Sequence, residues 1–352
     1  MKTTRRISGA LVGLVFFIAG LLKLMDPVGT GLIVGEYLKF FHLDFLSFAT
    51  TFFGEALALA ETLTGAALIT GFRPKIAAWA SGILLGVFTA ITLDLLIFNP
   101  SMSCGCFGEA IHLTHAQSFI KNVVLDLLWL LAFVPFVEAN FPRPRKLKTV
   151  GFGIAAVSSV AFMVFFLFSI PALDFTPFSP GTDLARGYES ISDNAPILSF
   201  SDARGEYDDS LALNGRLAVV SVYEPDRIDD DRWSAIGSFV RSSERSGMNA
   251  LILVASAPEL IAGQLPDPSL SEYCRFADRR TLMTLNRSNG GATMICDGQI
   301  VTKWAARALP DEDELARLSV AEAPVAVIEE NAPRRNLVQG FLLYVFAVML
   351  LL

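Results

Sequence analysis

The stretch ISGALVGLVFFIAGLLKL, residues 7–24, carries a single charge, Lys23. A helix that crosses the hydrocarbon core of a bilayer needs about 20 apolar residues, so this stretch predicts a membrane span. The start of the chain is basic, as in a secretory leader. The apolar run, however, continues into Asp26-Pro27 without a small-x-small cleavage site, so we expect the segment to be retained.

Further apolar stretches follow along the chain. They cover 46–71, 76–98, 118–138 and 149–170, and a shorter sixth candidate, 336–352, runs to the last residue. The sixth has 17 residues and would cross a bilayer by tilting or by thinning it. The composition agrees with a membrane protein, because 53% of the residues are hydrophobic, 18% are charged and the mean hydropathy is +0.50.

Charge divides the chain into two halves. Residues 1–171 hold 12 basic and 9 acidic side chains, whereas residues 172–352 hold 16 basic and 26 acidic ones. The acidic half excludes a nucleic-acid-binding protein, which needs a basic face. The apolar composition excludes a disordered chain. The predicted surroundings are therefore a lipid bilayer and proteins outside it, with no nucleic acid.

Basic residues near the ends of the spans predict the orientation. Clusters at residues 2–6, 73–75 and 143–148 fall at alternate span ends, and cytoplasmic loops are enriched in Lys and Arg. We therefore expect a multi-pass protein of the bacterial inner membrane with a cytoplasmic N-terminus. Loops 25–45 and 99–117 and the domain after residue 170 are then expected on the periplasmic side.

An α/β domain is expected outside the membrane, at about 193–322, after a Pro-containing linker at 172–192 and a fifth membrane helix at 141–171. Two short apolar runs, Leu217–Tyr223 and Leu251–Ala255, predict buried strands, and the amphipathic stretch between them, Trp233–Arg245, predicts a helix. Together they predict a βαβ unit. The runs Ala292–Cys296 and Gln299–Trp304 flank Asp297-Gly298, a dipeptide typical of a two-residue hairpin turn.

The residues with the clearest chemistry lie in loop 99–117, which contains Cys104-Gly105-Cys106. A glycine between two cysteines permits the sharp bend that a small disulfide needs, and strained disulfides are the more reactive ones. The alternative is a pair of inert packing cysteines. Positive charge at Lys121 is opposed by Glu109 and Asp94, so we expect strain and exposure, more than a lowered pKa, to make the pair reactive.

His112 and His115 follow the two cysteines closely. Thiolates and imidazoles bind zinc and copper, so Cys104, Cys106, His112 and His115 form an alternative, metal-binding interpretation of this loop. The spacing matches no standard zinc finger. The other interpretation places both histidines at the start of the helix that begins near Thr114.

Four acidic residues fall within predicted spans, where a charge costs about 2.5–3.5 kcal/mol at a helix centre. Asp94 lies near the outer end of its span and close to the cysteines, so it is a candidate for proton transfer or for a structural carboxylate. Glu55 and Glu61 are about 240° apart around a helix and do not share a face. At least one of them is expected to be a packing residue. Asp126 is the fourth.

Three features together resemble the DoxX-like/MauE family of membrane proteins: residues 13–27 (GLVFFIAGLLKLMDP), Glu55 with Glu61, and Cys104-Gly105-Cys106-Phe107-Gly108. The resemblance covers about residues 5–140, and the longer architecture is similar to a Bacteroidetes branch of the family.

The resemblance implies a four-helix membrane bundle and a link to methylamine utilisation, where MauE is implicated in maturing a disulfide-rich subunit. The bundle is similar to that of vitamin K epoxide reductase, a quinone-linked disulfide-forming enzyme. It therefore implies electron transfer by Cys104 and Cys106, with a quinone as the candidate cofactor, while the role of Asp94 in proton transfer rests on its position alone. The residues themselves indicate no quinone site.

The outer domain faintly resembles thioredoxin in its order of elements. It lacks the features of thioredoxin catalysis, because residues 223–227 read YEPDR in place of a Cys-x-x-Cys motif and residues 289–293 read NGGAT in place of a cis-proline. Its cysteines, Cys274 and Cys296, form either a structural disulfide or two buried free thiols.

Two functional hypotheses follow from the sequence. One is a membrane thiol–disulfide oxidoreductase, or a maturation accessory for envelope proteins, acting through Cys104 and Cys106. The other is a non-catalytic membrane scaffold whose acidic outer domain binds envelope proteins. A second membrane dithiol is absent from the sequence, so a redox role requires a thiol–disulfide partner or a quinone.

Overall fold

The computed structural model describes residues 2–134, 144–189 and 196–351. The chain forms two compact units: Met1–Leu167 together with Val338–Leu352, and Phe168–Leu337. Three parts of the sequence-based predictions lie outside the described residues: the end of the fourth span (135–138), Arg143, and the junction between linker and outer domain (190–195).

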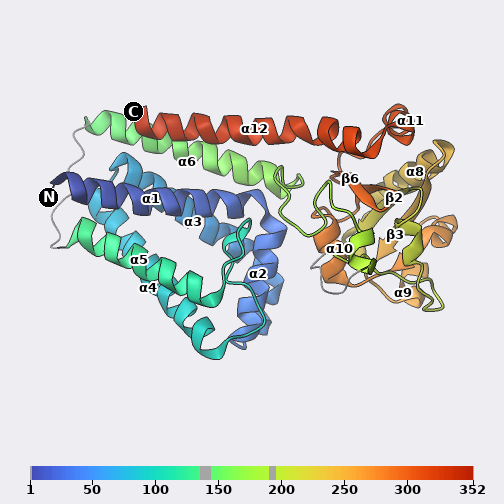
Figure 1. Cartoon of the computed structure of the whole chain (residues 1–352), viewed down its shortest axis with the longest axis horizontal. Helices are drawn as coiled ribbons and strands as arrows, with labels where there is room; N and C mark the ends of the chain where they lie inside the picture. The colour runs from blue at the N-terminus through green and yellow to red at the C-terminus, as the bar shows by residue number, and fades with distance from the viewer. Residues whose placement is uncertain (1, 135–143, 190–195, 352) are drawn as a thin grey trace. The chain divides into compact units, whose positions relative to one another are not determined.

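The first unit is a bundle of long helices that run side by side (Figure 1). Its main helices are α1 (Lys2–Met25), α3 (Thr50–Thr70), α4 (Pro74–Phe98), α5 (His115–Phe133) and α6 (Arg145–Leu167). Five helical segments of the described chain are long and apolar enough to cross a membrane, and they coincide with the first five predicted spans. The prediction of an all-helical membrane part is thus confirmed.

Glycines allow α1 and α3 to approach closely. A Cβ on Gly65 would lie 2.4 Å from the backbone nitrogen of Phe17, and a Cβ on Gly20 would lie 2.6 Å from the carbonyl oxygen of Ala58. Small residues at such positions are the usual means by which membrane helices pack. The close approach brings Lys23, near the end of α1, next to Glu61 of α3.

The sixth predicted span belongs to α12 (Ala323–Leu351), which is not among the five candidate spans. Its last part, from Val338, belongs to the helical unit, where Phe341 stacks on Phe162 with ring centroids 4.6 Å apart. Crossing of the membrane by residues 336–352 stays a prediction.

Two further helical segments lie in the predicted outer loop 25–45. α2 (Pro27–Phe40) starts at Asp26, whose side chain accepts a hydrogen bond from Gly29 N, and the short helix η1 (Asp44–Ala49) leads into α3. The sequence analysis did not predict α2. Asp26-Pro27 is nevertheless a strong start signal, because Asp is a good N-cap and Pro suits the first helical position.

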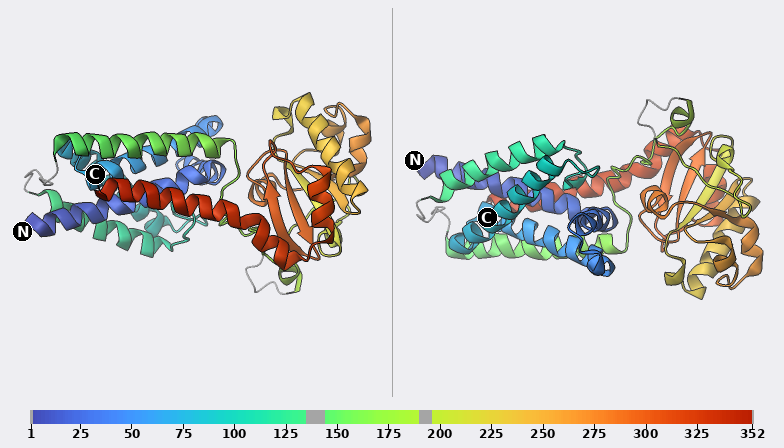
Figure 2. Two further views of the ribbon diagram at one scale, coloured as in Figure 1. Left: turned by 90° about the horizontal axis from the view of Figure 1, so that it is seen from above. Right: turned by 90° about the horizontal axis from the view of Figure 1, so that it is seen from below.

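The second unit contains a five-stranded sheet of order β4-β3-β2-β5-β6, flanked by helices (Figure 2). The strands are β2 (Arg216–Val222), β3 (Asn249–Val254), β4 (Cys274–Phe276), β5 (Gly291–Cys296) and β6 (Gln299–Trp304). β2 pairs in parallel with β3, β3 pairs in parallel with β4, and β5 is antiparallel to both β2 and β6.

The predicted βαβ unit and hairpin are both present. Helix α8 (Asp230–Arg245) connects β2 to β3 and buries Trp233 and Ile236 in the core. Asp297 and Gly298 join β5 to β6 with φ values of 46° and 80°, as a type I′ turn requires. An α/β unit is therefore confirmed, while its relation to thioredoxin stays a prediction.

The remaining helices of this unit are shorter. They are α7 (Ala185–Glu189), η2 (Asp209–Ala212), η3 (Pro225–Arg227), α9 (Pro258–Ala262), η4 (Pro268–Tyr273), α10 (Arg279–Leu285) and α11 (Glu312–Val320).

The described part of the predicted linker 172–192 is packed against the sheet. Gly181 N donates to Ile300 O at 2.7 Å, and Leu184 N donates to Gly298 O at 2.8 Å. These bonds pair part of the outer edge of β6, whose backbone groups would otherwise be open. The described part of the predicted linker thus belongs to the second unit, which begins at Phe168.

The structure also contradicts a Cys274–Cys296 disulfide, since both residues are free thiols. Cys274 lies on β4 and Cys296 on β5, with β3 and β2 between them. At about 4.8 Å per strand spacing the two backbones are roughly 14 Å apart, whereas a disulfide needs Cα atoms within about 7 Å. Burial raises the pKa of Cys274 to about 11, which makes it an unreactive thiol.

Candidate functional site: a dithiol at an apolar cavity

Cys104 and Cys106 lie in the loop between α4 and α5, which turns back against α1 and α2 (Figure 1). Residues Cys106–Glu109 form the short strand β1. Gly105 and Gly108 have φ values of 61° and 62°, and Gly108 N donates to Gly105 O at 3.0 Å. The glycines thus produce the bend that brings the two cysteines to one side of the loop.

Gly105 is also confined by its neighbours. A Cβ at this position would lie 2.4 Å from Cγ2 of Ile33 on α2. Any other residue would therefore be opposed both by the positive φ and by the lack of space.

Gly105→Ala is therefore expected to displace the loop from α2 and to slow reaction of the dithiol. Gly153→Ala is the matched control, because nothing lies within 4 Å of a Cβ at that position. The measurement is the rate of Cys104 and Cys106 alkylation in the full-length protein, together with its unfolding temperature. Equal rates and equal unfolding temperatures in the two variants would contradict this account of Gly105.

Both cysteines line a cavity of about 280 Å³ inside the helical unit. Side chains from α1 to α5 form its mostly apolar wall, and examples are Val15, Val34, Leu57, Leu85 and Leu125. Cys104 is buried and Cys106 is partly exposed. The size and apolar lining of this cavity suit a small apolar molecule, which would lie beside Cys104 and Cys106.

Polar groups gather around the cysteines. Tyr37 of α2 donates from its hydroxyl to Cys104 O at 2.6 Å, which ties the loop to α2. Lys121 of α5 lines the same cavity, with its Nζ 5.2 Å from the ring centroid of Phe107.

A buried ion pair forms another polar part of the wall. Lys23 Nζ lies 2.7 Å from Glu61 Oε1 and 2.9 Å from Glu61 Oε2. Glu61 is 1% exposed, so its charge is balanced by Lys23 and not by water. Glu61 stands out in the sequence as a charge within a span, but its pairing with Lys23 was not predicted. The pairing could have been found in the sequence, because Lys23 and Glu61 both lie in predicted spans, carry opposite charges and each need a partner there.

Residues 1–135 match the family model of the methylamine utilisation protein MauE. This part of the chain is similar to the MauE family. The match ends before α6, so α6, the α/β unit and α12 lie outside it. Comparison with curated proteins found no match, and neither did comparison with solved structures.

Within the MauE-family domain the two cysteines have different acidities. A hydrogen bond from the Cys106 thiol stabilises the Cys104 thiolate, and Ser118, Lys121 and Tyr37 add to this effect. Together they outweigh burial and lower the pKa of Cys104 to about 6. The same bond and burial raise the pKa of Cys106 above its usual range. The charges in the sequence were expected to cancel in part, but in the structure the pKa of Cys104 is lowered.

Alkylation of Cys104 by a small neutral reagent should thus be half-maximal near pH 6, and the rate should level off by about pH 7.5, because a thiolate with a lowered pKa forms at lower pH. Lys121→Met should move the midpoint upward, and Lys146→Met, which changes an exposed lysine elsewhere, should not move it. Mass spectrometry of the alkylated peptide measures both rates. A midpoint at pH 8.5 or above in the unaltered protein would refute the assignment.

The four candidate metal ligands do not come together. His115 Nδ1 lies 3.1 Å from Asn99 Oδ1 and its Nε2 lies 2.9 Å from Met102 O, while the exposed His112 lies 4.0 Å from Glu109. No cluster of three or more His, Cys, Asp or Glu suited to a metal ion occurs among the described residues. His115 is the first residue of α5, after the capping Thr114, as the helix-start interpretation expected.

The acidic residues of the spans have different surroundings. Asp94 is partly exposed on α4 and does not line the cavity, so its role in proton transfer stays a prediction. Asp126 accepts a hydrogen bond from Thr89 at 2.7 Å, which makes it a structural carboxylate. Glu55 is buried outside the cavity, and its carboxylate has no hydrogen-bond partner in the described structure. Glu55 and Glu61 thus point to different environments.

Proposed function

We propose that the MauE-family domain is a membrane thiol–disulfide redox module, acting as an oxidoreductase or a maturation accessory for envelope proteins. The observation that carries this proposal is the placement of Cys104 and Cys106 on one cavity wall, with Cys106 stabilising the Cys104 thiolate. Two cysteines that only fill space would need neither a hydrogen bond between their sulfur atoms nor a lysine such as Lys121 nearby. The methylamine link belongs to the family name, and the proposal for this chain is limited to thiol chemistry.

The unequal acidities indicate how a Cys104–Cys106 disulfide would react. A thiolate of a partner protein attacks Cys106, which is the more exposed residue of the two, and Cys104 leaves as the better-stabilised thiolate. A second thiol of the partner then attacks the partner's own sulfur in the mixed disulfide and releases Cys106 as a thiol. The partner loses two electrons and two protons and gains a disulfide, and the Cys104–Cys106 pair becomes a dithiol.

Reoxidation of the dithiol requires an acceptor, and we propose a quinone. The cavity residues fit such a molecule, because apolar side chains form most of the wall while Tyr37, Lys121 and the Lys23–Glu61 pair supply polar groups beside the thiols. A bound quinone would accept two electrons and two protons. The Cys104 thiolate, stabilised by Lys121 and Cys106, is the group that is ready to donate electrons at neutral pH.

The redox proposal needs the cysteines on the oxidising side of the inner membrane. Cys104 is expected on the outer side. Substituted-cysteine labelling in intact cells with an impermeant reagent should therefore modify Ser101→Cys, an exposed position in the same loop, and leave Lys75→Cys and Lys148→Cys unmodified, because basic residues stay cytoplasmic. Labelling at position 75 but not at position 101 would reverse the orientation and exclude periplasmic thiol chemistry.

A direct test uses the purified full-length chain, a reduced dithiol peptide and a water-soluble quinone. We expect catalytic loss of peptide thiols that depends on both the protein and the quinone. Thiol loss that is equal without the protein would refute the proposal.

A non-catalytic scaffold is the second candidate. One observation favours it: Cys274 and Cys296 in the second unit are buried and far apart, so that unit has no dithiol of its own. If full cellular function persists in a Cys104→Ser/Cys106→Ser variant, the scaffold is the correct function.

A further inference from the structure

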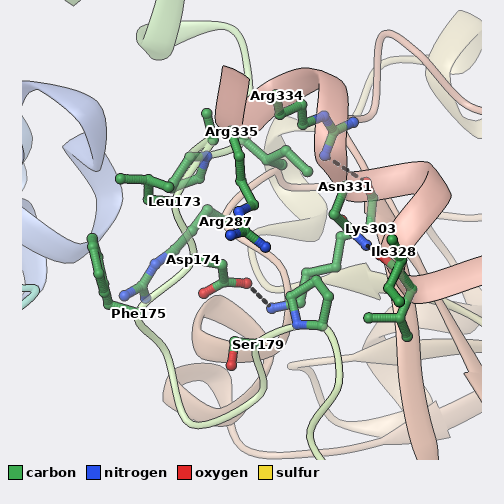
Figure 3. Close-up of a pocket in the computed structure, with 15 residues that line it drawn as sticks. Leu173, Asp174, Phe175, Ser179, Arg287, Lys303, Ile328, Asn331, Arg334 and Arg335 are labelled. Carbon is green, nitrogen blue, oxygen red and sulfur yellow. Dashed lines mark hydrogen bonds and ion pairs between the residues drawn. The ribbon is translucent and has the colours of Figure 1, made fainter. Parts of the chain in front are cut away.

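A pocket of about 290 Å³ in the second unit concentrates positive charge (Figure 3). Four of its lining residues are cations, Arg287, Lys303, Arg334 and Arg335, and among the described lining residues the one carboxylate is Asp174. The sequence from 172 to 337 contains 16 basic and 26 acidic residues. The positive surplus of the pocket is thus opposite to the charge of the unit that contains it.

Asp174 balances one of the four cations. Its Oδ2 lies 2.5 Å from Nζ of Lys303, which is 4% exposed, and its Oδ1 accepts from Thr176 N at 2.9 Å. Burial would raise the pKa of Asp174, but Lys303 and Thr176 outweigh burial and keep that pKa below its usual value. The carboxylate is therefore ionised and committed to Lys303. The lining retains a formal surplus of three positive charges.

Backbone carbonyls hold two of the arginines at the pocket. Arg334 Nη1 donates to Lys303 O, and Arg287 Nη1 donates to Met283 O, each at 3.0 Å. The acceptor of Arg334 is neutral, so it fixes this guanidinium group without cancelling its charge. A guanidinium presents five N–H donors in a planar fork that suits phosphate oxygens.

The acidic residues nearest to Arg334 are engaged elsewhere. Glu330 pairs with Arg317 at 2.6 Å, and Glu314 accepts from Trp304 Nε1 at 3.3 Å. Neither lines the pocket. Burial lowers the pKa of Arg334, which shows that desolvation of its charge exceeds the attraction of these two carboxylates. An anion in the pocket would compensate for that desolvation.

The other side of the pocket is apolar. Leu173, Phe175, Val327 and Ile328 contribute to the lining, and Phe175 and Ile328 are exposed by 40% and 71%. Ile170, another lining residue, follows the last residue of α6 by three positions, which the chain can extend to at most about 10 Å. The covalent chain therefore keeps Ile170, and the part of the pocket that it lines, within about 10 Å of the end of α6, which is a candidate membrane span.

We propose that this pocket binds the phosphate headgroup of an anionic phospholipid, with the arginines on the phosphate and the apolar side chains along the start of the acyl chains. Basic pockets beside membrane segments recognise anionic headgroups in this way. Free soluble phosphate esters share the headgroup chemistry but would leave the apolar side of the pocket unused.

The test uses the full-length protein in neutral detergent, with phosphatidylglycerol, phosphatidylcholine or glycerol 3-phosphate added and native mass spectrometry as the readout. We expect one phosphatidylglycerol to be retained and phosphatidylcholine to be lost. Equal retention of the two lipids would overturn the proposal. If glycerol 3-phosphate binds as tightly as phosphatidylglycerol, the pocket is a site for a soluble phosphate ester and the proposal of a lipid ligand is overturned.

Variants with opposite expected signs separate binding from misfolding. Arg335→Gln, at an exposed position, and Arg334→Gln/Arg335→Gln should weaken phosphatidylglycerol binding, the double variant by about tenfold or more. Asp174→Asn removes the one lining carboxylate and should strengthen binding. Arg204→Gln, an exposed change outside the pocket, should have no effect. Equal binding by the unaltered protein and the double variant would overturn the assignment.

Discussion

Replacement of either Cys104 or Cys106 by Ser should abolish thiol oxidation, with a loss of at least about 100-fold, because exchange through a disulfide needs both sulfur atoms. The two variants should differ in what they trap. In Cys104→Ser the more exposed cysteine, Cys106, remains; its thiolate can attack the disulfide of an oxidised partner, release one partner thiolate and accumulate as a mixed disulfide. In Cys106→Ser the buried Cys104 remains and should accumulate much less.

The measurement for this prediction is peptide-thiol oxidation by the purified variants, combined with non-reducing electrophoresis of membranes. Cys274→Ser/Cys296→Ser is the matched control, because it removes the same number of sulfur atoms as a double variant of the loop but from buried positions in the second unit. It should retain activity. Loss of activity in this control with retention in Cys104→Ser would place the active thiols in the second unit.

Lys23→Met should destabilise the helical unit by about 3–5 kcal/mol, the usual cost of leaving one partner of a buried ion pair uncompensated. Glu61 is 1% exposed, so water cannot replace the missing ammonium. The double variant Lys23→Met/Glu61→Gln removes both charges and should recover much of the loss. Thermal unfolding of the full-length protein in detergent measures these differences.

Arg245→Met provides the matched control for Lys23→Met. Arg245 pairs with Glu312 at 2.7 Å, but both side chains are more than half exposed. An exposed pair contributes at most about 1 kcal/mol, so this variant should unfold almost as the unaltered protein does. If Lys23→Met were no more harmful than Arg245→Met, the buried pair would not stabilise the bundle.

Local sequence patterns predicted the elements whose formation depends on neighbouring residues alone. Length and hydropathy located the five candidate spans, and Asp297-Gly298 located the hairpin, because the dipeptide tolerates positive φ at both positions. α2 was missed because three glycines in GTGLIVGEYLKF, residues 29–40, lower the helix propensity of this loop.

The site was only partly predictable because it depends on contacts between distant segments. Cys104-Gly105-Cys106 is evident in the sequence, but the cavity requires side chains from α1 to α5. The lowered pKa of Cys104 depends on Cys106, Ser118 and Lys121 in three dimensions. A sequence count of nearby charges could not show that His115 is bound elsewhere or that Asp94 lies off the cavity.

The choice between a Cys274–Cys296 disulfide and free thiols, and the packing of the linker, also depend on tertiary structure. Cys274 and Cys296 looked compatible in the sequence, and the strand order that separates them is set by tertiary packing. The segment around Gly181 looked like a linker because of its proline and glycine content. Its hydrogen bonds to β6 became visible only with the sheet in place.

The central claim is that Cys104 and Cys106 exchange electrons in the membrane, and their redox state tests it most directly. Native membranes would be treated with one alkylating reagent, reduced, treated with a second of different mass and analysed by mass spectrometry. We predict a Cys104–Cys106 disulfide when the quinone pool is oxidised, and two alkylated thiols when that pool is reduced. Two free thiols under both conditions would contradict the redox function.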